Sequence, residues 1–205
     1  MKEKWNERYA EAGYAYGTEP NEFFKEMLSQ LQIKPSRMLL PAEGQGRNAV
    51  FAAVNGWQVD AFDISVEGKK KADRLATSHG VTINFEVGTL DEVHYTAESF
   101  DIIGLIFAHF PPNIRLGYHQ KFIEWLKPGG YIVLEAFAKR HLELSTKNPQ
   151  AGGPRDASLL FSIEEVQQEF AGLSVQLLEE KTVKLQEGKY HVGESAVIRF
   201  LGQKL

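Results

Sequence analysis

The residues of this chain with the clearest chemical meaning form a glycine-rich bend between an apolar strand pattern and a helix pattern. Gly44 and Gly46 follow Met38–Ala42 and precede Arg47–Asn55. Glycines at this place let the backbone turn sharply and leave no side chain against a ligand that lies across the turn. The free N–H groups that begin the helix face the same ligand. The bend therefore predicts a site for a nucleoside-containing ligand.

A carboxylate, Asp63, lies about 20 residues beyond the bend, at the end of a second expected strand. An acid at that distance holds the hydroxyls of a ribose. The bend, G-x-G-x-x-A, also satisfies the fingerprint of dinucleotide-binding proteins, so an NAD-dependent oxidoreductase is one interpretation. Such an enzyme needs a second mononucleotide-binding half, whereas the sequence after Tyr131 supplies only one helix and a hairpin.

Alternating strand and helix patterns predict the sheet that positions these residues. The expected strands are Met38–Ala42, Gln58–Asp63, Thr82–Val87, Phe100–Phe107 and Tyr131–Phe137, and the expected helices are Arg47–Asn55, Val66–His79, Asn113–Leu126 and Ile163–Phe170. The runs Ser174–Leu185 and Tyr190–Leu201 predict a terminal hairpin. We expect a single-domain α/β chain with a doubly wound, Rossmann-like, mostly parallel sheet that ends in an antiparallel C-terminal hairpin. Its expected parts are an N-terminal flap and helix (1–35), a cofactor-binding core (36–137), a variable loop (138–160), and a C-terminal helix and hairpin (161–205).

Composition narrows the possible functions. The 205 residues, 43% of them hydrophobic, suffice for one α/β domain but not for an added substrate domain. A net charge of −4 makes a nucleic-acid partner unlikely. The chain has no cysteine and its six histidines lack metal-ligand spacing, so we expect no metal. No stretch approaches about 20 apolar residues, which predicts a cytoplasmic protein without membrane contact.

These residues and further motifs resemble the class I S-adenosylmethionine-dependent methyltransferases, and within them the small bacterial group related to tellurite-resistance and thiopurine methyltransferases. The matching segments are Trp5–Tyr9, Tyr16–Asn21, Ala42–Ala49, Phe62–Ser65, Leu126–Gly130 and Glu187–Gly193. The resemblance implies S-adenosyl-L-methionine as cofactor and methyl transfer to a small-molecule acceptor.

The resemblance also implies how the cofactor is held. Gly44 and Gly46 contact the methionine moiety, Asp63 holds the ribose hydroxyls, and Thr89-Leu90 contacts adenine. The other residues expected at the cofactor are Glu43, Arg47, Ile64, Phe107, Tyr9 and Tyr16.

Two positions depart from the family pattern. The common loop begins Asp-x-Gly where this chain has Leu40 and Ala42, so Glu43 is expected to replace the missing carboxylate near the cofactor ammonium. Many relatives have an acid at the position of Thr89, which leaves Asp91 or a backbone carbonyl for adenine N6.

Displacement of a methyl group from a sulfonium needs no catalytic triad, because proximity and alignment can supply up to about 7–11 kcal/mol. A base or anion clamp for the acceptor has three candidates: His109 after the fourth strand, His191 at the start of the last strand, and Arg155 in the long loop. We expect both histidines to face the methyl group. The structural alternatives are a helix cap or backbone hydrogen bond for His109, exposure at a hairpin end for His191, and an ion pair for Arg155.

The four aromatic residues from Trp5 to Tyr16 do not follow one helical period, and they suit either a flap over the sulfonium or packing on the sheet edge. Arg47 at a helix start is unfavourable for the helix dipole, which indicates an anionic partner such as the cofactor carboxylate or Glu43. The remaining histidines, expected at the surface, are His79, His94, His119 and His141.

Methyl transfer to a small molecule is thus the favoured interpretation. An NAD-dependent oxidoreductase and a non-catalytic adenosylmethionine-binding module are the alternatives. The acceptor could be a thiol, a metalloid oxyanion or a heterocycle, and the sequence does not predict an oligomeric state.

Overall fold

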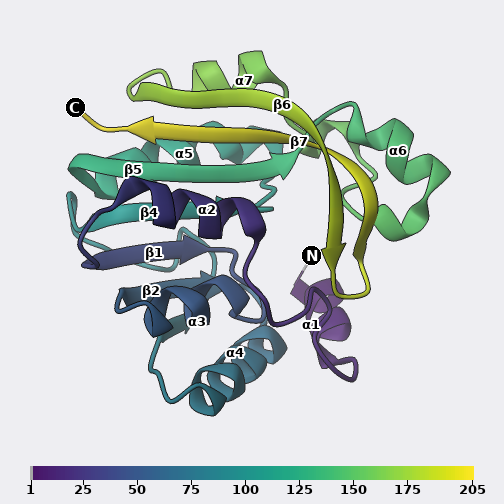
Figure 1. Ribbon diagram of the computed structural model, residues 1–205, viewed down its shortest axis with the longest axis horizontal. Coiled ribbons are helices and arrows are strands. Elements are labelled where there is room, and N and C mark those ends of the chain that lie inside the picture. Colours follow the sequence, from purple (N-terminus) through teal and green to yellow (C-terminus); the bar gives the residue numbers. More distant parts are fainter. Residues whose placement is uncertain (1) are drawn as a thin grey trace.

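The computed structural model describes residues 2–205, which build a seven-stranded sheet in the order β3-β2-β1-β4-β5-β7-β6 (Figure 1). The parallel strands are β1 (Arg37–Pro41), β2 (Gln58–Asp63), β3 (Asn84–Val87), β4 (Phe100–Ile106) and β5 (Leu126–Phe137). The antiparallel strands are β6 (Ser174–Glu187) and β7 (His191–Gln203), and β7 pairs with β5. Strand order reverses between β1 and β4, and open α/β sheets bind ligands beside the carboxyl ends of such strands.

Helices cover both faces of the sheet, because successive side chains of a strand point to opposite sides. In β1, Met38 and Leu40 belong to one apolar core and Leu39 to the other, and all three are fully buried. The first core includes residues of α2 (Glu22–Leu31), α3 (Arg47–Val54) and α4 (Val66–Ser78), and the second includes residues of α5 (Pro112–Trp125) and α7 (Ile163–Glu169).

The C-terminal hairpin extends past the sheet, and its turn lies beside the segment that follows α1 (Lys2–Ala10) (Figure 1). Gly188 has φ +59°, and a Cβ there would meet the carbonyl oxygen of Ala15. The N–H of Lys189 donates to the same carbonyl at 2.9 Å, and the Tyr190 hydroxyl donates to Glu11 at 2.6 Å. The turn and the N-terminal segment therefore form one continuous wall at the carboxyl edge of the sheet.

The predicted fold class, a mostly parallel sheet ending in an antiparallel hairpin, is confirmed. β5 begins at Leu126, before the expected Tyr131, because Leu126 pairs with Phe100 across a register shift. The expected loop Ala138–Leu160 is wrong in part, since it contains α6 (His141–Lys147) and two 3₁₀ turns at Pro149–Ala151 and Ala157–Leu159. Apolar side chains of α6 pack against the cores, which stabilises a helix too short to show a clear sequence period.

One further expectation is wrong. His119 and His141 are fully buried rather than on the surface, and they stack on Phe170 and Phe137 with ring centroids 4.5 and 4.1 Å apart. Trp5 and Tyr9 lie one turn apart on α1 and stack at 5.4 Å, while Tyr14 and Tyr16 follow the end of that helix. No helix of residues 2–205 combines the length and the apolar character needed to cross a membrane.

Candidate active site

The bend after β1 is a tight loop whose backbone requires glycine. Gly44 has φ +63° and Gly46 has φ +85°. A Cβ at Gly46 would lie 2.6 Å from the Cβ of Ala72 on α4, and one at Gly44 would lie 2.5 Å from the hydroxyl oxygen of Tyr9. Ala42 also has a positive φ, +52°, which strains a residue that carries a Cβ. Tyr9 and Ala72 pack against the two glycines and hold the loop in this shape.

Glu43 points back onto the start of α3. Its carboxylate accepts the N–H groups of Asn48 and Ala49, both at 2.8 Å, and the side-chain amide of Asn48 at 3.3 Å. These N–H groups belong to the first turn of α3, where no helix carbonyl can accept them. Burial raises the pKa of Glu43 to about 7, although the N–H donors favour its ionised form. Glu43 thus caps a helix, and its expected contact with the cofactor ammonium stays a prediction.

Asp63 ends β2 beside the glycine loop. One of its oxygens accepts the N–H of Gly44 at 3.0 Å, and the other accepts the N–H of Ser65 at 2.8 Å. A carboxylate offers about four acceptor sites, so each oxygen keeps about one. Burial raises the pKa of Asp63 to about 6, which leaves it mainly ionised above neutral pH. The carboxylate can therefore accept two neighbouring hydroxyl groups.

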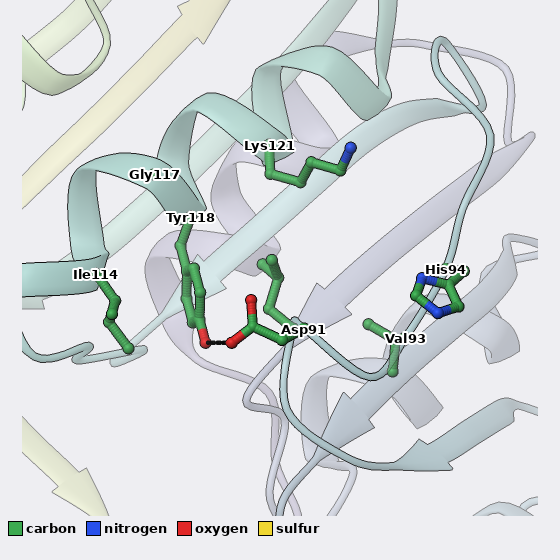
Figure 2. A pocket seen from close by; sticks show the side chains of 8 residues that line it. Asp91, Val93, His94, Ile114, Gly117, Tyr118 and Lys121 are labelled. Atoms are coloured by element: carbon green, nitrogen blue, oxygen red, sulfur yellow. Dashed lines mark hydrogen bonds between the residues drawn. The ribbon is translucent and has the colours of Figure 1, made fainter.

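The segment after β3 lies near α5, with Leu90 buried and Thr89 exposed. Figure 2 shows the Asp91 carboxylate accepting the Tyr118 hydroxyl, at 2.9 Å, beside a shallow hollow of about 550 Å³. Both Leu90 and Asp91 line this hollow. The roles expected of Thr89, Leu90 and Asp91 at adenine stay predictions, as does that of the half-buried Ile64 after Asp63.

Helix α1 covers the glycine loop. Tyr9 is 5% exposed, and its ring lies close to the positions that a Cβ would take at Gly44 and Gly68. The Ser65 hydroxyl donates to Asn6 at 2.7 Å, which ties α1 to the start of α4. Burial raises the pKa of Tyr9, so its hydroxyl is neutral at physiological pH. This placement agrees with a flap, while contact of Tyr9 with a cofactor stays a prediction.

A second polar cluster lies where the hairpin turn meets α3. Glu187 accepts Nδ1–H of His191 at 2.9 Å, the guanidinium of Arg47 at 2.8 Å and the side-chain amide of Asn21 at 3.1 Å. The protein anion paired with Arg47 is therefore Glu187, and not Glu43 as one expectation had it. Burial opposes ionisation of Glu187, but the His191 hydrogen bond and the Arg47 charge outweigh it and lower its pKa to about 2.

Aromatic rings surround His191. The ring centroids of Tyr16, Phe107 and Phe137 lie 4.4, 4.7 and 5.1 Å from that of His191. Phe107 has φ +52°, which is a strained conformation for a bulky residue. Such strained conformations cluster at functional sites. Burial lowers the pKa of His191, while the hydrogen bond and charge of Glu187 act against this. We conclude that His191 is mainly neutral at pH 7.

His109 contacts the same ring as His191, since its centroid lies 5.7 Å from that of Phe137. However, its Nδ1 lies 2.7 Å from the carbonyl oxygen of Leu159, and its Nε2 accepts the N–H of Phe137 at 3.3 Å. Burial lowers the pKa of His109 to about 4, so the neutral ring that makes both bonds is the stable form. Backbone groups thus engage both nitrogen atoms of His109, and the acceptor role expected of it stays a prediction.

Arg155 is held at the end of α6, where its guanidinium donates to the carbonyl of Ser145 at 2.8 Å. The alternative of an ion pair with Asp156 or Glu135 is not met within residues 2–205, where Glu135 pairs with Arg199 at 2.6 Å and Asp156 accepts the N–H of Ser158 at 2.9 Å. Among residues 2–205, no hydrogen bond joins Arg155 to either of the two candidate histidines. Its substrate role stays a prediction.

Sequence reasoning missed several polar residues at this edge. Gln45 accepts the N–H of Ala15 at 2.7 Å, and its buried Nε2 has no hydrogen-bond partner within residues 2–205. Asn21 bridges Glu135, at 2.7 Å, and Glu187, at 3.1 Å. Asn21 and Glu187 both lie in motifs that carry the family resemblance, but only the fold brings these motifs together.

Comparison with known proteins finds similarity to methyltransferases. Residues 41–130 match the model of a methyltransferase domain. Phosphoethanolamine N-methyltransferase 1 of Arabidopsis thaliana is 26% identical over 129 residues, which cover 62% of this chain but only 25% of that protein. A SAM-dependent methyltransferase of Methanosarcina mazei has 18% identity and a TM-score of 0.73 over 91% of this chain and 99% of that one. TehB of Haemophilus influenzae has 14% identity and a TM-score of 0.71 over 100% and 67% of the two chains.

Residues 41–130 thus match a methyltransferase domain, and the chain shares the fold of class I S-adenosylmethionine-dependent methyltransferases. The cofactor of this class is S-adenosyl-L-methionine, and the residues at the edge of the methyltransferase sheet fit it. Asp63 has acceptor sites for ribose hydroxyls, and Gln45 has a buried N–H₂ donor without a partner within residues 2–205. The methyltransferase-domain match and the shared fold agree with the expectation of this cofactor.

Proposed function

We propose that this methyltransferase transfers the methyl group of S-adenosyl-L-methionine to a small-molecule acceptor. The observation that carries the proposal is the position of Asp63. Its carboxylate lies against Gly44 at the carboxyl edge of the parallel sheet, and each oxygen keeps about one acceptor site. A nucleoside with two adjacent hydroxyls matches this arrangement.

Two comparisons support a small-molecule acceptor. One relative is named for phosphoethanolamine, and a structure with a TM-score of 0.79 and 16% identity, covering 100% of this chain and 92% of that one, concerns the conversion of a disulfide bond into a thioacetal group during echinomycin biosynthesis. The hairpin turn also contacts the segment that follows α1, and α1 covers the glycine loop, an arrangement that favours a small acceptor over a polymer.

The bound cofactor supplies an activated methyl group on a sulfonium. In this proposal Asp63 holds its ribose, Gln45 donates to a polar group of its methionine portion, and Tyr9 covers the glycine loop. On the acceptor side, His191 offers a nitrogen for proton removal, while His109 supports Phe137.

Release of S-adenosylhomocysteine over an acceptor panel tests the proposal. We expect turnover with at least one small thiol, heterocycle or metalloid oxyanion, and lower turnover in Asp63→Ala when the cofactor is limiting. Binding of NAD in place of S-adenosylhomocysteine would overturn the proposal. Tight binding of S-adenosylhomocysteine without turnover of any acceptor would instead indicate a non-catalytic binding module.

A further inference from the structure

Glu187 and His191 have the geometry of an oriented base. Nδ1 of His191 lies 2.9 Å from a Glu187 oxygen, and this is the only hydrogen bond of the ring within residues 2–205. An ionised carboxylate can only accept, so Nδ1 carries the proton in the neutral ring. Nε2 then holds a lone pair and can accept a proton.

The carboxylate of Glu187 is itself held in place. Arg47 donates to it at 2.8 Å, and both side chains are about one tenth exposed, at 9% and 11%. Asn21 donates to it at 3.1 Å, while the N–H of Asn21 is fixed by Asn48 at 2.9 Å. A buried carboxylate with three donors is restricted in rotation, which fixes the imidazole that it contacts.

We infer that Glu187 is a positioning residue that holds the Nδ1–H form of His191, and that Nε2 of His191 removes the proton of a neutral thiol acceptor. The inference rests on the proposed methyl transfer.

The surroundings of His191 favour a neutral acceptor over an oxyanion. Arg47 and Arg199 each pair with a buried carboxylate, at 2.8 and 2.6 Å, so their charges are already balanced. Arg8 donates to the Tyr16 hydroxyl at 2.9 Å and lies over the Tyr190 ring. Three aromatic rings also lie against the imidazole, and polarizable sulfur makes favourable contacts with such rings.

The proposed step balances as follows. The S–H proton moves to Nε2, and the acceptor sulfur uses its own electron pair to bond the methyl carbon. The bond from that carbon to the sulfonium breaks, and its electron pair stays on the departing thioether. The imidazolium, whose charge Glu187 offsets, then loses its proton to water.

Nitrogen NMR of the imidazole tests the positioning role without any acceptor. At pH 7.5 we expect His191 to be protonated at Nδ1 and unprotonated at Nε2. In Glu187→Gln the preference for Nδ1–H should weaken, whereas Glu180→Gln, in the same strand and ion-paired at the surface with Arg140, should leave it unchanged. Protonation at Nε2 in the wild-type protein would overturn the inference even if Glu187→Gln does not fold.

A pair of thiols tests the base. His191→Ala should lower turnover of an alkyl thiol, which is protonated at the assay pH, by about 10²–10⁴-fold. It should lower turnover of an aryl thiol that is already ionised by only a few fold. Equal losses for the two thiols would overturn proton removal by His191.

The pH dependence of kcat/KM adds a measurement that would not change if Glu187 had a purely structural role. The ionisable groups around His191 are Glu187, Arg47, Arg8, Tyr16, Tyr190, His109 and His141. The hydrogen bond and charge of Glu187 raise the pKa of His191, so Glu187→Gln should shift the acid limb of kcat/KM to lower pH as well as lower the plateau. A lower plateau with an unmoved limb would overturn the positioning role. Absence of turnover by the wild-type protein with every acceptor would overturn the proposed function and the thiol assignment, while the tautomer would still decide the role of Glu187.

Discussion

Replacement of Asp63 perturbs the cofactor site directly, and two different substitutions separate the effect of its charge from the effect of its hydrogen-bond acceptors. The carboxylate accepts one backbone N–H at each oxygen, from Gly44 at 3.0 Å and from Ser65 at 2.8 Å. Asp63→Asn keeps one oxygen acceptor but removes the charge. Asp63→Ala removes both acceptors and leaves two N–H groups without their partner.

The expected loss follows from hydrogen-bond energies. Bonds to a charged group contribute about 1.5–3 kcal/mol and neutral ones about 0.5–1.5 kcal/mol. Asp63→Asn should therefore weaken S-adenosylhomocysteine binding by about 1–1.5 kcal/mol, or roughly tenfold. Asp63→Ala should weaken it by about 1.5–3 kcal/mol, or roughly 10- to 150-fold.

Isothermal titration calorimetry with S-adenosylhomocysteine measures these losses. Asp73→Asn is the matched control, because Asp73 lies on α4 with its side chain 49% exposed and pairs only with Lys69. Circular dichroism should show an intact fold in all variants. If Asp63→Ala binds with wild-type affinity, Asp63 does not contact the cofactor and the assignment of the site fails.

Three further predictions concern the same edge of the sheet. Gly44→Val should abolish S-adenosylhomocysteine binding, because a Cβ there would lie 2.5 Å from the Tyr9 hydroxyl oxygen and φ is +63°. Normal affinity by calorimetry would show that the loop is only a structural turn. S-adenosylhomocysteine affinity should fall as the pH drops from 7.5 to 5, because the pKa of Asp63 is raised to about 6 and protonation removes the charged acceptor; a flat profile would contradict this. His109→Ala should lower the free energy of unfolding by about 2–4 kcal/mol, because it leaves a cavity and removes two hydrogen bonds to the backbone. Urea unfolding measures this loss, and an unchanged stability would refute a structural role of His109. The pKa of His109 is lowered to about 4 from 6.5, so the stability that its neutral ring contributes should be present above pH 6.5 and decline as the pH falls toward 4, a decline that is missing in the variant.

Local signals were sufficient for the core of the fold. Near-continuous apolar runs such as Phe100–Phe107 predicted buried parallel strands. The glycine-rich bend predicted a sharp backbone turn, and Gly44 and Gly46 both have positive φ. Helix α6 was missed because its seven residues show too short a pattern among prolines and glycines, and its stability comes from tertiary packing.

The polar cluster could be predicted only in part. Glu187 and His191 are close in sequence, but their contacts with Arg47 and Asn21 join residues more than a hundred positions apart. Burial of His119 and His141 was missed for a related reason. An imidazole on a polar helix resembles a surface residue in sequence, and only the packed rings of Phe170 and Phe137 reveal its aromatic role.

A crystal structure of the protein with S-adenosylhomocysteine would test the central claim most directly. We predict the two ribose hydroxyls within hydrogen-bond distance of the two Asp63 oxygens, with the ligand lying across Gly44 and Gly46 beneath Tyr9. A ligand bound elsewhere, or with its ribose away from Asp63, would contradict the account.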